Sequence, residues 1–328
     1  MRRTAGRIGF VVLLALGVGG CMNGSAEPPA TKKSGDAFAA DREAPVEPAA
    51  FDAKRAMGYL EALCKIGPRI SGSEGMKKQQ EMLAKHFKEQ GGQIRWQRFT
   101  ATQRSNRKDV EMANLIVSWQ PELPRRVILC SHYDTRPTAD EEHNPARWKQ
   151  PFLSANDGGS GVALLMELAH HMKDLKLRAG VDFVLFDGEE YIFDTDDKYF
   201  FGSEHFGREY RKGRGKTFYG AAVLLDMVGG KKPKFPLEPY SWEKAGGLVE
   251  TIWGIAAELK CDAFDANSFG ARVQDDHLAL NQNGIPAIDI IDFSYPHWHK
   301  LSDLPENCSG ESLEQVAKVL SVWIQRVK

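Results

Sequence analysis

Acidic side chains follow an apolar segment of this sequence at the point where the segment ends. In FVLFDGEEY, residues 183–191, the apolar run is followed by Asp187, Glu189 and Glu190. Like charges this close repel one another unless a cation or a shared proton relieves them. Because adjacent residues of an extended chain point to opposite sides, one glutamate can bind a metal while the other faces a reacting group. Taken alone, the pair is equally typical of a solvated acidic loop.

Histidines and further carboxylates end the other apolar segments. In SHYDT, His132 and Asp134 leave one face of a strand, which suits a metal ligand and the carboxylate that orients it, or simply a polar strand end. Asp157 precedes a glycine-rich helix start and is either the N-cap of that helix or a metal ligand. The set contains no cysteine, which is typical of a hydrolytic or Lewis-acid zinc site, and it comprises His132, Asp134, Asp157, Glu189, Glu190, Asp226, Asp275, Asp276, His277, His297 and His299.

The elements that must position these side chains alternate between helical and strand patterns. Apolar spacing predicts helices over 52–67, 74–92, 157–175, 245–261 and 310–327, and strands over 93–101, 114–120, 126–134, 181–190, 220–230 and 286–294. Ser73 is expected to cap the second helix. The order predicts an α/β fold, a three-layer α/β/α sandwich with a mixed, mostly parallel central sheet. In such sheets ligands bind outside the carboxyl ends of the strands.

The N-terminus carries an export pattern. Basic MRRTAGR is followed by IGFVVLLALGVGGC, an apolar stretch that is too short to remain as a membrane anchor. VGGC resembles a lipobox, so Cys21 is expected to be lipidated; an ordinary signal peptide containing this cysteine is the alternative. We predict a lipoprotein signal peptide over 1–21, a disordered tether over 22–50 and one catalytic domain over 51–328, held at a bacterial membrane and facing the periplasm or cell envelope.

Composition excludes some other functions. The net charge of −1 gives no case for binding to nucleic acid or to a bulk membrane surface. The four later cysteines follow no zinc-binding pattern and are expected to be buried free thiols: Cys64, Cys130, Cys261 and Cys308.

Taken together, the motifs resemble a known superfamily. SHYDT, ANDGGSGVALLMELA, FVLFDGEE, LLDMVG, QDDHLALNQNGIPA and HWH occur in the order and spacing of the zinc-dependent aminopeptidase fold. The match runs from about residue 67 to the C-terminus and is closer to the glutaminyl cyclase branch. No one of these motifs is specific; the set is.

The resemblance to glutaminyl cyclases implies an acyltransferase with one zinc ion. The residues that match the zinc ligands are Asp157, Glu190 and His299. Glu189 matches the catalytic glutamate, and two hydrogen-bonded acids match Asp226 and Asp275. The implied reaction converts the N-terminal glutamine of peptides or proteins to pyroglutamate with release of ammonia.

Two other functions remain open. A di-zinc aminopeptidase would hold a second metal through His132 and Asp226 and would hydrolyse N-terminal peptide bonds. A non-catalytic, membrane-tethered binding protein on the same scaffold would be expected to have lost Glu189 or His299, and both are present.

Three features favour the cyclase. QDDH adds an acid, Asp275, before the Asp-His pair, as cyclases do. Trp298 and Tyr295 suit a small aromatic pocket for a glutamine side chain, although simple packing would also explain them. The stretch between Glu190 and Gly202 is as long as the cyclase loop.

Other parts of the chain depart from the family pattern. Lys300 stands where relatives generally have threonine. The loop over 136–154 has its own composition, and 264–272 matches nothing that predicts a role.

Overall fold

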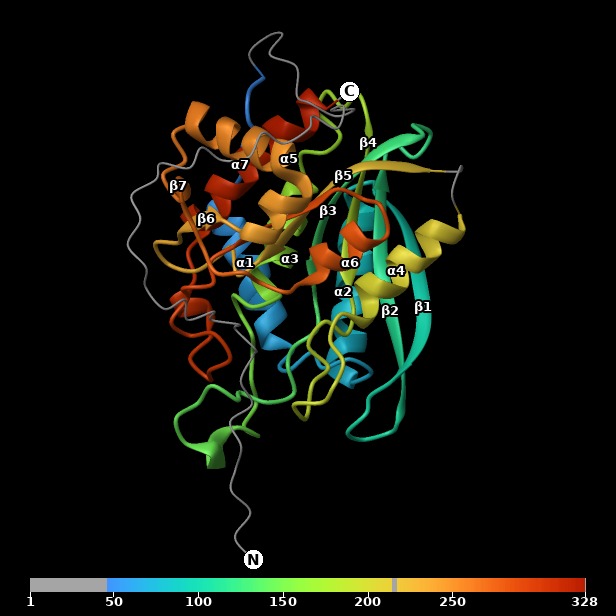
Figure 1. The fold of residues 1–328 in the computed structure, drawn as a ribbon, viewed down its shortest axis with the longest axis vertical. Coiled ribbons are helices and arrows are strands. Elements are labelled where there is room, and N and C mark those ends of the chain that lie inside the picture. Colours follow the sequence, from blue (N-terminus) through green and yellow to red (C-terminus); the bar gives the residue numbers. More distant parts are fainter. Residues whose placement is uncertain (1–45, 214–216, 328) are drawn as a thin grey trace, which may run out of the picture.

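Four adjacent parallel strands of the sheet bring the candidate residues to their common carboxyl ends. The computed structural model describes residues 46–213 and 217–327. Its six-stranded sheet has the order β1-β2-β4-β3-β5-β8, in which β4, β3, β5 and β8 are parallel while β1 and β2 are antiparallel additions (Figure 1). The strands are β1 (Gln93–Thr102), β2 (Asp109–Trp119), β3 (Arg125–His132), β4 (Gly180–Phe186), β5 (Phe218–Asp226) and β8 (Ala287–Ile291). The predicted mixed, mostly parallel sheet is confirmed.

Helices cover both faces of the sheet, which confirms the three layers. One face packs against α1 (Ala53–Lys65), α2 (Glu74–Glu89), α3 (Gly159–Leu168), α5 (Pro239–Glu258) and α7 (Gly310–Arg326). The other face packs against α4 (Phe201–Lys212) and α6 (Asp276–Gln282). Alternate residues of one strand belong to opposite layers: Phe183 of β4 contributes to the first core and Val184 to the second. Every residue of β4 is buried, as expected for a strand covered on both sides.

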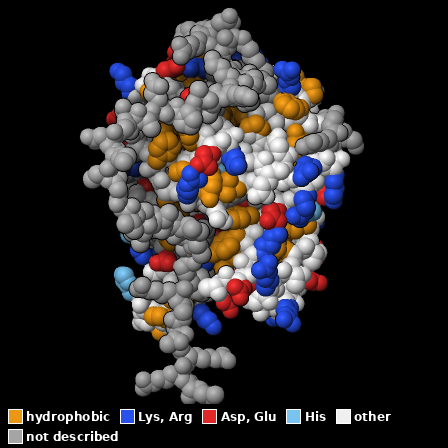
Figure 2. Space-filling model, viewed as in Figure 1, with side chains coloured by type: hydrophobic (Ala, Val, Ile, Leu, Met, Phe, Trp, Pro, Cys, Tyr) orange, Lys and Arg blue, Asp and Glu red, His pale blue; other side chains and the backbone are white. Residues whose placement is uncertain are grey.

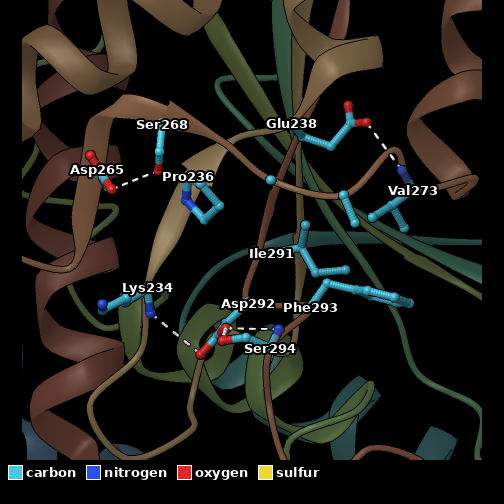
Figure 3. Close-up of a pocket in the computed structure, with 12 residues that line it drawn as sticks. Lys234, Pro236, Glu238, Asp265, Ser268, Val273, Ile291, Asp292, Phe293 and Ser294 are labelled. Atoms are coloured by element: carbon cyan, nitrogen blue, oxygen red, sulfur yellow. Dashed lines mark hydrogen bonds between the residues drawn. The ribbon is translucent and has the colours of Figure 1, made fainter. Parts of the chain in front are cut away.

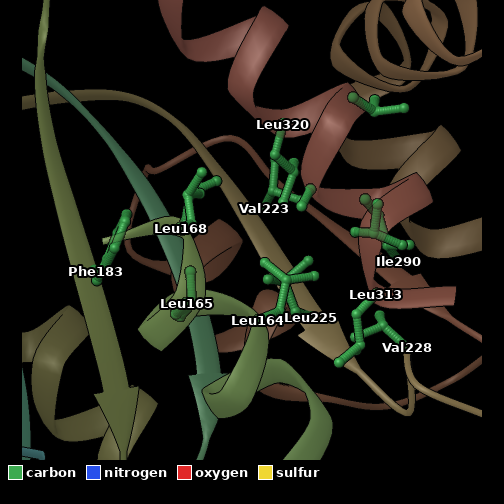
Figure 4. Packing of buried hydrophobic residues seen from close by; sticks show 14 of the residues in the cluster. Leu164, Leu165, Leu168, Phe183, Val223, Leu225, Val228, Ile290, Leu313 and Leu320 are labelled. Carbon is green, nitrogen blue, oxygen red and sulfur yellow. The ribbon is translucent and has the colours of Figure 1, made fainter. Parts of the chain in front are cut away.

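The larger core lies between α3, the sheet and α7. Figure 4 shows Leu164, Leu165 and Leu168 of α3 beside Val223 of β5, with Leu320 of α7 nearby. The continuous apolar surface of α3 is therefore a consequence of burial on all sides, since each of its residues is buried. This packing fixes the start of α3, where Asp157 lies.

The structure confirms the predicted cap of α2 but differs from the sequence prediction at α5 and at two short strands. Ser73 accepts a hydrogen bond from the amide of Met76, as predicted for α2. The helix expected over 245–261 begins earlier, at Pro239, and Ala245 has non-helical dihedral angles inside it. Two short strands not predicted from the sequence, β6 (Phe235–Leu237) and β7 (Phe264–Phe269), form a separate parallel pair. Single 3₁₀ turns occupy Pro145–Arg147 and Pro305–Asn307.

The described chain begins with residues that already pack against the domain. Ala49 is buried and its amide donates to Ser321 Oγ in α7, so the packing extends a little before residue 51. Cys21 and the predicted signal peptide lie outside the described residues. No helix in the described ranges has both the length and the apolar character needed to cross a bilayer. The later cysteines are free and buried, as expected, and burial raises the pKa of the Cys64 thiol to about 11.

Candidate active site

The two adjacent glutamates lie in a bend beyond the end of β4. Gly188 has a φ of +75°, and a Cβ there would lie 2.6 Å from Met112 Sδ, so only glycine fits. The sequence predicts an extended segment here, but the structure has a bend instead. The Asp134 carboxylate accepts the amides of Glu189 and Glu190 at 3.1 and 3.0 Å and fixes the bend. The two glutamate side chains nevertheless meet different partners.

Asp134 has a different role from the one predicted. Its Oδ1 lies 3.7 Å from His132 Nδ1, which is too far for a hydrogen bond that would orient the imidazole. The other ring nitrogen of His132, Nε2, lies 3.1 Å from Asp157 Oδ1 and 3.3 Å from Asp226 Oδ1. His132 thus joins the ends of β3 and β5 to the loop before α3.

Asp157 is not the N-cap of α3. The cap position belongs to Gly158, which makes no side-chain cap hydrogen bond. Gly158 has a φ of +71°, and a Cβ there would lie 2.6 Å from His132 Cε1. The Asp157 backbone amide donates to Asp303, which leaves the Asp157 carboxylate facing the histidines.

His299 closes the cluster from the loop after β8. Its Nε2 lies 2.7 Å from Glu190 Oε1 and 3.6 Å from Asp157 Oδ2. Its backbone has a φ of +52°, an uncommon conformation for a non-glycine residue and one that the surrounding fold must hold in place. The structure therefore brings Asp157, Glu190 and His299 together, with His132 beside them.

These side chains suit a metal ion. Ligand atoms of His132, Asp157 and Glu190 lie within 4.8 Å of one another. Three buried atoms in this group have no hydrogen-bond partner among the described residues: Asp157 Oδ2, Glu190 Oε2 and His132 Nδ1. Unpartnered buried polar atoms are costly unless something else satisfies them. Imidazole nitrogens and carboxylate oxygens are ligands that zinc accepts.

Burial and neighbouring charges shift the pKa values of the carboxylates in this cluster. Burial and the neighbouring Glu190 raise the pKa of Asp157 to about 7. Burial and Glu190 also raise the pKa of Glu189 well above its usual range. Glu190 is the exception, because His299 and Arg136 outweigh the effect of burial and lower its pKa.

Two residues of this network, Arg136 and Asp140, were missed by sequence reasoning. Arg136 donates through Nε and Nη2 to both Asp140 oxygens at 2.8 Å, and its Nη1 lies 3.6 Å from Glu190 Oε1. Asp140 Oδ1 lies 3.1 Å from His299 Nδ1. Both belong to the loop over 136–154, in which an Arg and an Asp four residues apart are the only signal, and nothing in the loop predicts their burial.

Asp275 and Asp226 lie near the cluster without joining the three predicted ligands. Asp275 caps α6 by accepting the amide of Asp276, and burial together with Asp226 raises its pKa well above the usual range. Asp226 ends β5 beside His132. The charge of Asp275 also contributes to the high pKa of Glu189.

The two aromatic residues predicted to contact substrate, Trp298 and Tyr295, have different partners in the structure. Trp298 stacks on His299 with 4.0 Å between ring centroids, and its contact with substrate stays a prediction. Tyr295 is buried, and its hydroxyl donates to Asp303 Oδ1, so in this structure it supports the loop that carries Asp157. Its contact with substrate stays a prediction.

Two histidines of the candidate set lie apart from the cluster. His277 Nε2 lies 3.5 Å from Glu238, and His297 Nδ1 lies 2.8 Å from Ser302 Oγ. Among the described residues, neither forms a hydrogen bond or ion pair with the predicted metal ligands. Both are therefore set aside as ligands.

We expect Asp140→Asn to weaken zinc binding about 10- to 100-fold, because it weakens the carboxylate contact that orients His299. Equilibrium dialysis against a zinc buffer measures this change. Glu141→Gln is the matched control, since Glu141 is the exposed neighbour and only its backbone amide contacts His299. Equal zinc affinity in Asp140→Asn and the unchanged protein would show that Asp140 does not position the ligand.

Comparisons with known proteins place this geometry in a family context. The model of Peptidase family M28 matches residues 114–324. Glutaminyl-peptide cyclotransferase from Bos taurus is 24% identical over 242 residues, which is 65% of this chain and 65% of the relative. Aminopeptidase YwaD from Bacillus subtilis is 26% identical over 218 residues, 61% of this chain and 41% of the relative. The match thus spans less than two thirds of these curated relatives.

Solved structures agree over more of the chain. Fimbriiglobus ruber glutaminyl cyclase is 48% identical, with a TM-score of 0.85 over 88% of this chain and 100% of that one. A leucine aminopeptidase precursor from Bacteroides thetaiotaomicron is 28% identical, with a TM-score of 0.80 over 86% of this chain and 99% of that one. Both branches weighed from the sequence are therefore represented among the similar structures.

Proposed function

The chain belongs to peptidase family M28, and we propose that it is a zinc-dependent glutaminyl-peptide cyclotransferase. The observation that carries this proposal is a buried acidic group, Glu189, Asp226 and Asp275, beside a cluster able to hold zinc. The similarity to glutaminyl cyclase of Fimbriiglobus ruber supports the same choice. The substrates we propose are peptide or protein N-termini, and nucleic acid is not among them.

One zinc ion is proposed to bind to Asp157, Glu190 and His299. Bound there, it would act as a Lewis acid on the γ-carbonyl oxygen of an N-terminal glutamine. The α-amine of that residue attacks within the same molecule, so its proximity is already supplied by the substrate. The chain's task is then to exclude water and to move one proton.

Glu189 is proposed to carry that proton from the α-amine to the departing ammonia. Glu189 as a whole residue is 8% exposed and lies beside the predicted ligands without binding the metal in this proposal. Burial and Glu190 raise its pKa, so it can hold a proton in a range where an ordinary glutamate is ionised. Asp275 is proposed to share a proton with it, because the charge of Asp275 raises the pKa of Glu189 and the two carboxylates cannot both be charged at little cost, and Asp226 is the third acid of the proposed group.

A di-zinc aminopeptidase is the second candidate, and one observation favours it. His132 Nε2 lies 3.1 Å from Asp157 and 3.3 Å from Asp226, so these residues could share a second metal. In that enzyme Glu189 would take a proton from water, and Asp275 would matter less. The non-catalytic interpretation is not favoured, because Glu189 and His299 are both present and the similar proteins include enzymes.

An assay of the purified domain separates the two enzymes. We expect release of ammonia from a glutaminyl peptide, no release of free amino acid from an aminoacyl chromogenic substrate, and about one zinc ion per chain by metal analysis. Free amino acid together with two tightly held zinc ions would favour the aminopeptidase and overturn the cyclase proposal.

We also propose that the chain is exported and anchored to a bacterial membrane through a lipid on Cys21, with its catalytic domain in the periplasm or cell envelope. The VGGC motif supports this proposal. Cys21→Ser is expected to move the protein from the membrane fraction to the soluble fraction, as followed by immunoblotting of fractionated cells. Cys64→Ser is the control and should leave the distribution unchanged. Retention of Cys21→Ser in the membrane fraction would exclude the lipid anchor.

A further inference from the structure

A cavity of about 320 Å³ lies between the β6–β7 pair and the end of β8 (Figure 3). Its apolar walls are formed by Pro236, Val273, Ile291 and Phe293. Part of its lining comes from the segment over 264–272, for which the sequence suggested no role. The volume is at the lower end of the range for ligand pockets, about 300–1,000 Å³. One extended side chain is therefore a suitable occupant.

Two aromatic rings connect the cavity to the candidate active site. The Phe293 ring lies 5.1 Å from the ring of Trp298, which in turn stacks at 4.0 Å on His299. Val273, on another wall, is two residues before Asp275. An extended peptide advances ~3.3–3.6 Å per residue. A peptide whose N-terminal residue lies at His299 can thus reach the cavity within its next three residues.

The cavity carries an excess of negative charge. Its lining contains three carboxylates, Glu238, Asp265 and Asp292, and one amine, Lys234. Glu238 and Asp292 are 2% and 5% exposed and accept backbone amides of the chain, which holds them in place (Figure 3). Burial would raise the pKa of Glu238, but His277 and these amides outweigh it and keep the carboxylate ionised.

Apolar walls with an acidic excess complement one kind of side chain. The aliphatic part of lysine or arginine can pack against Phe293, Ile291 and Pro236 while its charged end faces the carboxylates. An acidic side chain would instead meet charges of its own sign, and such repulsion is an effective source of specificity.

We propose that this cavity is a subsite for a lysine or arginine side chain within the three residues that follow the N-terminal glutamine of the substrate. The inference rests on the proposed cyclase function and adds a preference for basic peptides. It assigns a role to β6, β7 and the end of β8 that the metal cluster alone does not require.

The test uses two variants that change the cavity at exposed or rim positions. Asp265→Lys reverses a charge whose hydrogen bonds stay within its own turn, to Asn267 and Ser268. Ala271→Trp fills the cavity from an exposed position. Asp262→Lys is the matched control, because it makes the same charge change three residues earlier and outside the lining. Turnover of glutamine amide, which is too short to reach the cavity, reports whether each variant is folded.

The substrates are peptides with N-terminal glutamine and a single lysine, alanine or glutamate at residue 2, 3 or 4. We expect the KM of the best lysine peptide to be about five- to tenfold below that of its glutamate counterpart, as one partly shielded charge contact provides. Asp265→Lys and Ala271→Trp should remove this difference, and Asp262→Lys should keep it.

Failure of the subsite and failure of the cyclase are distinguishable. Ammonia release with equal KM for all peptides, or with a difference that both cavity variants retain, overturns the subsite and leaves the cyclase intact. If no peptide releases ammonia, the cyclase proposal fails. Calorimetric binding of the corresponding pyroglutamyl peptides then decides the subsite: a preference for lysine that both variants remove supports it, and equal binding overturns it.

Discussion

Glu189→Gln is expected to lower kcat by about 10²- to 10⁴-fold while leaving the zinc content unchanged. The amide keeps the size and shape of the side chain but cannot accept the proton of the attacking amine. Among the described residues, the Glu189 side chain forms no hydrogen bond or ion pair with Glu190 or His299, and its Oε2 lies 3.8 Å from His132 Nδ1. The measurement is ammonia release under saturating glutaminyl peptide, together with metal analysis of the same sample.

The adjacent residue is the matched control. Glu190→Gln makes the same chemical change one position along the chain, but Glu190 Oε1 lies 2.7 Å from His299 Nε2 in the metal cluster. We expect this variant to lose zinc and activity together. If Glu189→Gln instead lost zinc, or retained normal turnover, the division of the pair into ligand and base would be wrong.

The ends of the parallel strands could be predicted from sequence for a simple physical reason. A strand buried on both faces is a continuous apolar run, so the first polar residue after it marks the sheet edge. That pattern predicts His132, Asp226 and the Glu189–Glu190 pair at the carboxyl ends of the strands. The alternation that divides Phe183 from Val184 into separate cores follows from the same two-residue period.

Residues that act through loops could not be predicted in this way. Arg136 and Asp140 carry no periodic signal, and their burial depends on the distant His299 and Glu190 folding against them. Asp134 shows the opposite problem. Its spacing from His132 predicts a contact with the imidazole, but the bend at Gly188 brings two backbone amides to the carboxylate, and these take the place of the imidazole.

Zinc affinity is expected to rise steeply with pH between about 6 and 9. In the metal-free protein, burial and Arg136 lower the pKa of His299, but Glu190 and Asp140 outweigh them and raise it to about 9. Burial and Glu190 raise the pKa of Asp157 to about 7. At pH 7 His299 therefore holds a proton and Asp157 is partly protonated, and both must lose their protons to bind a metal.

Each displaced proton changes the affinity by about tenfold per pH unit below the pKa of its group. Removing zinc with a chelator should thus abolish turnover at any pH, and restoring activity should need more zinc at pH 6 than at pH 8. Calorimetry in two buffers of different ionisation enthalpy counts the protons released, and we expect between one and two at pH 7. Asp140→Asn weakens a hydrogen bond that raises the pKa of His299, so it should reduce this proton release. A zinc affinity that does not change between pH 6 and 8 would mean that His299 and Asp157 are not the groups that bind the ion.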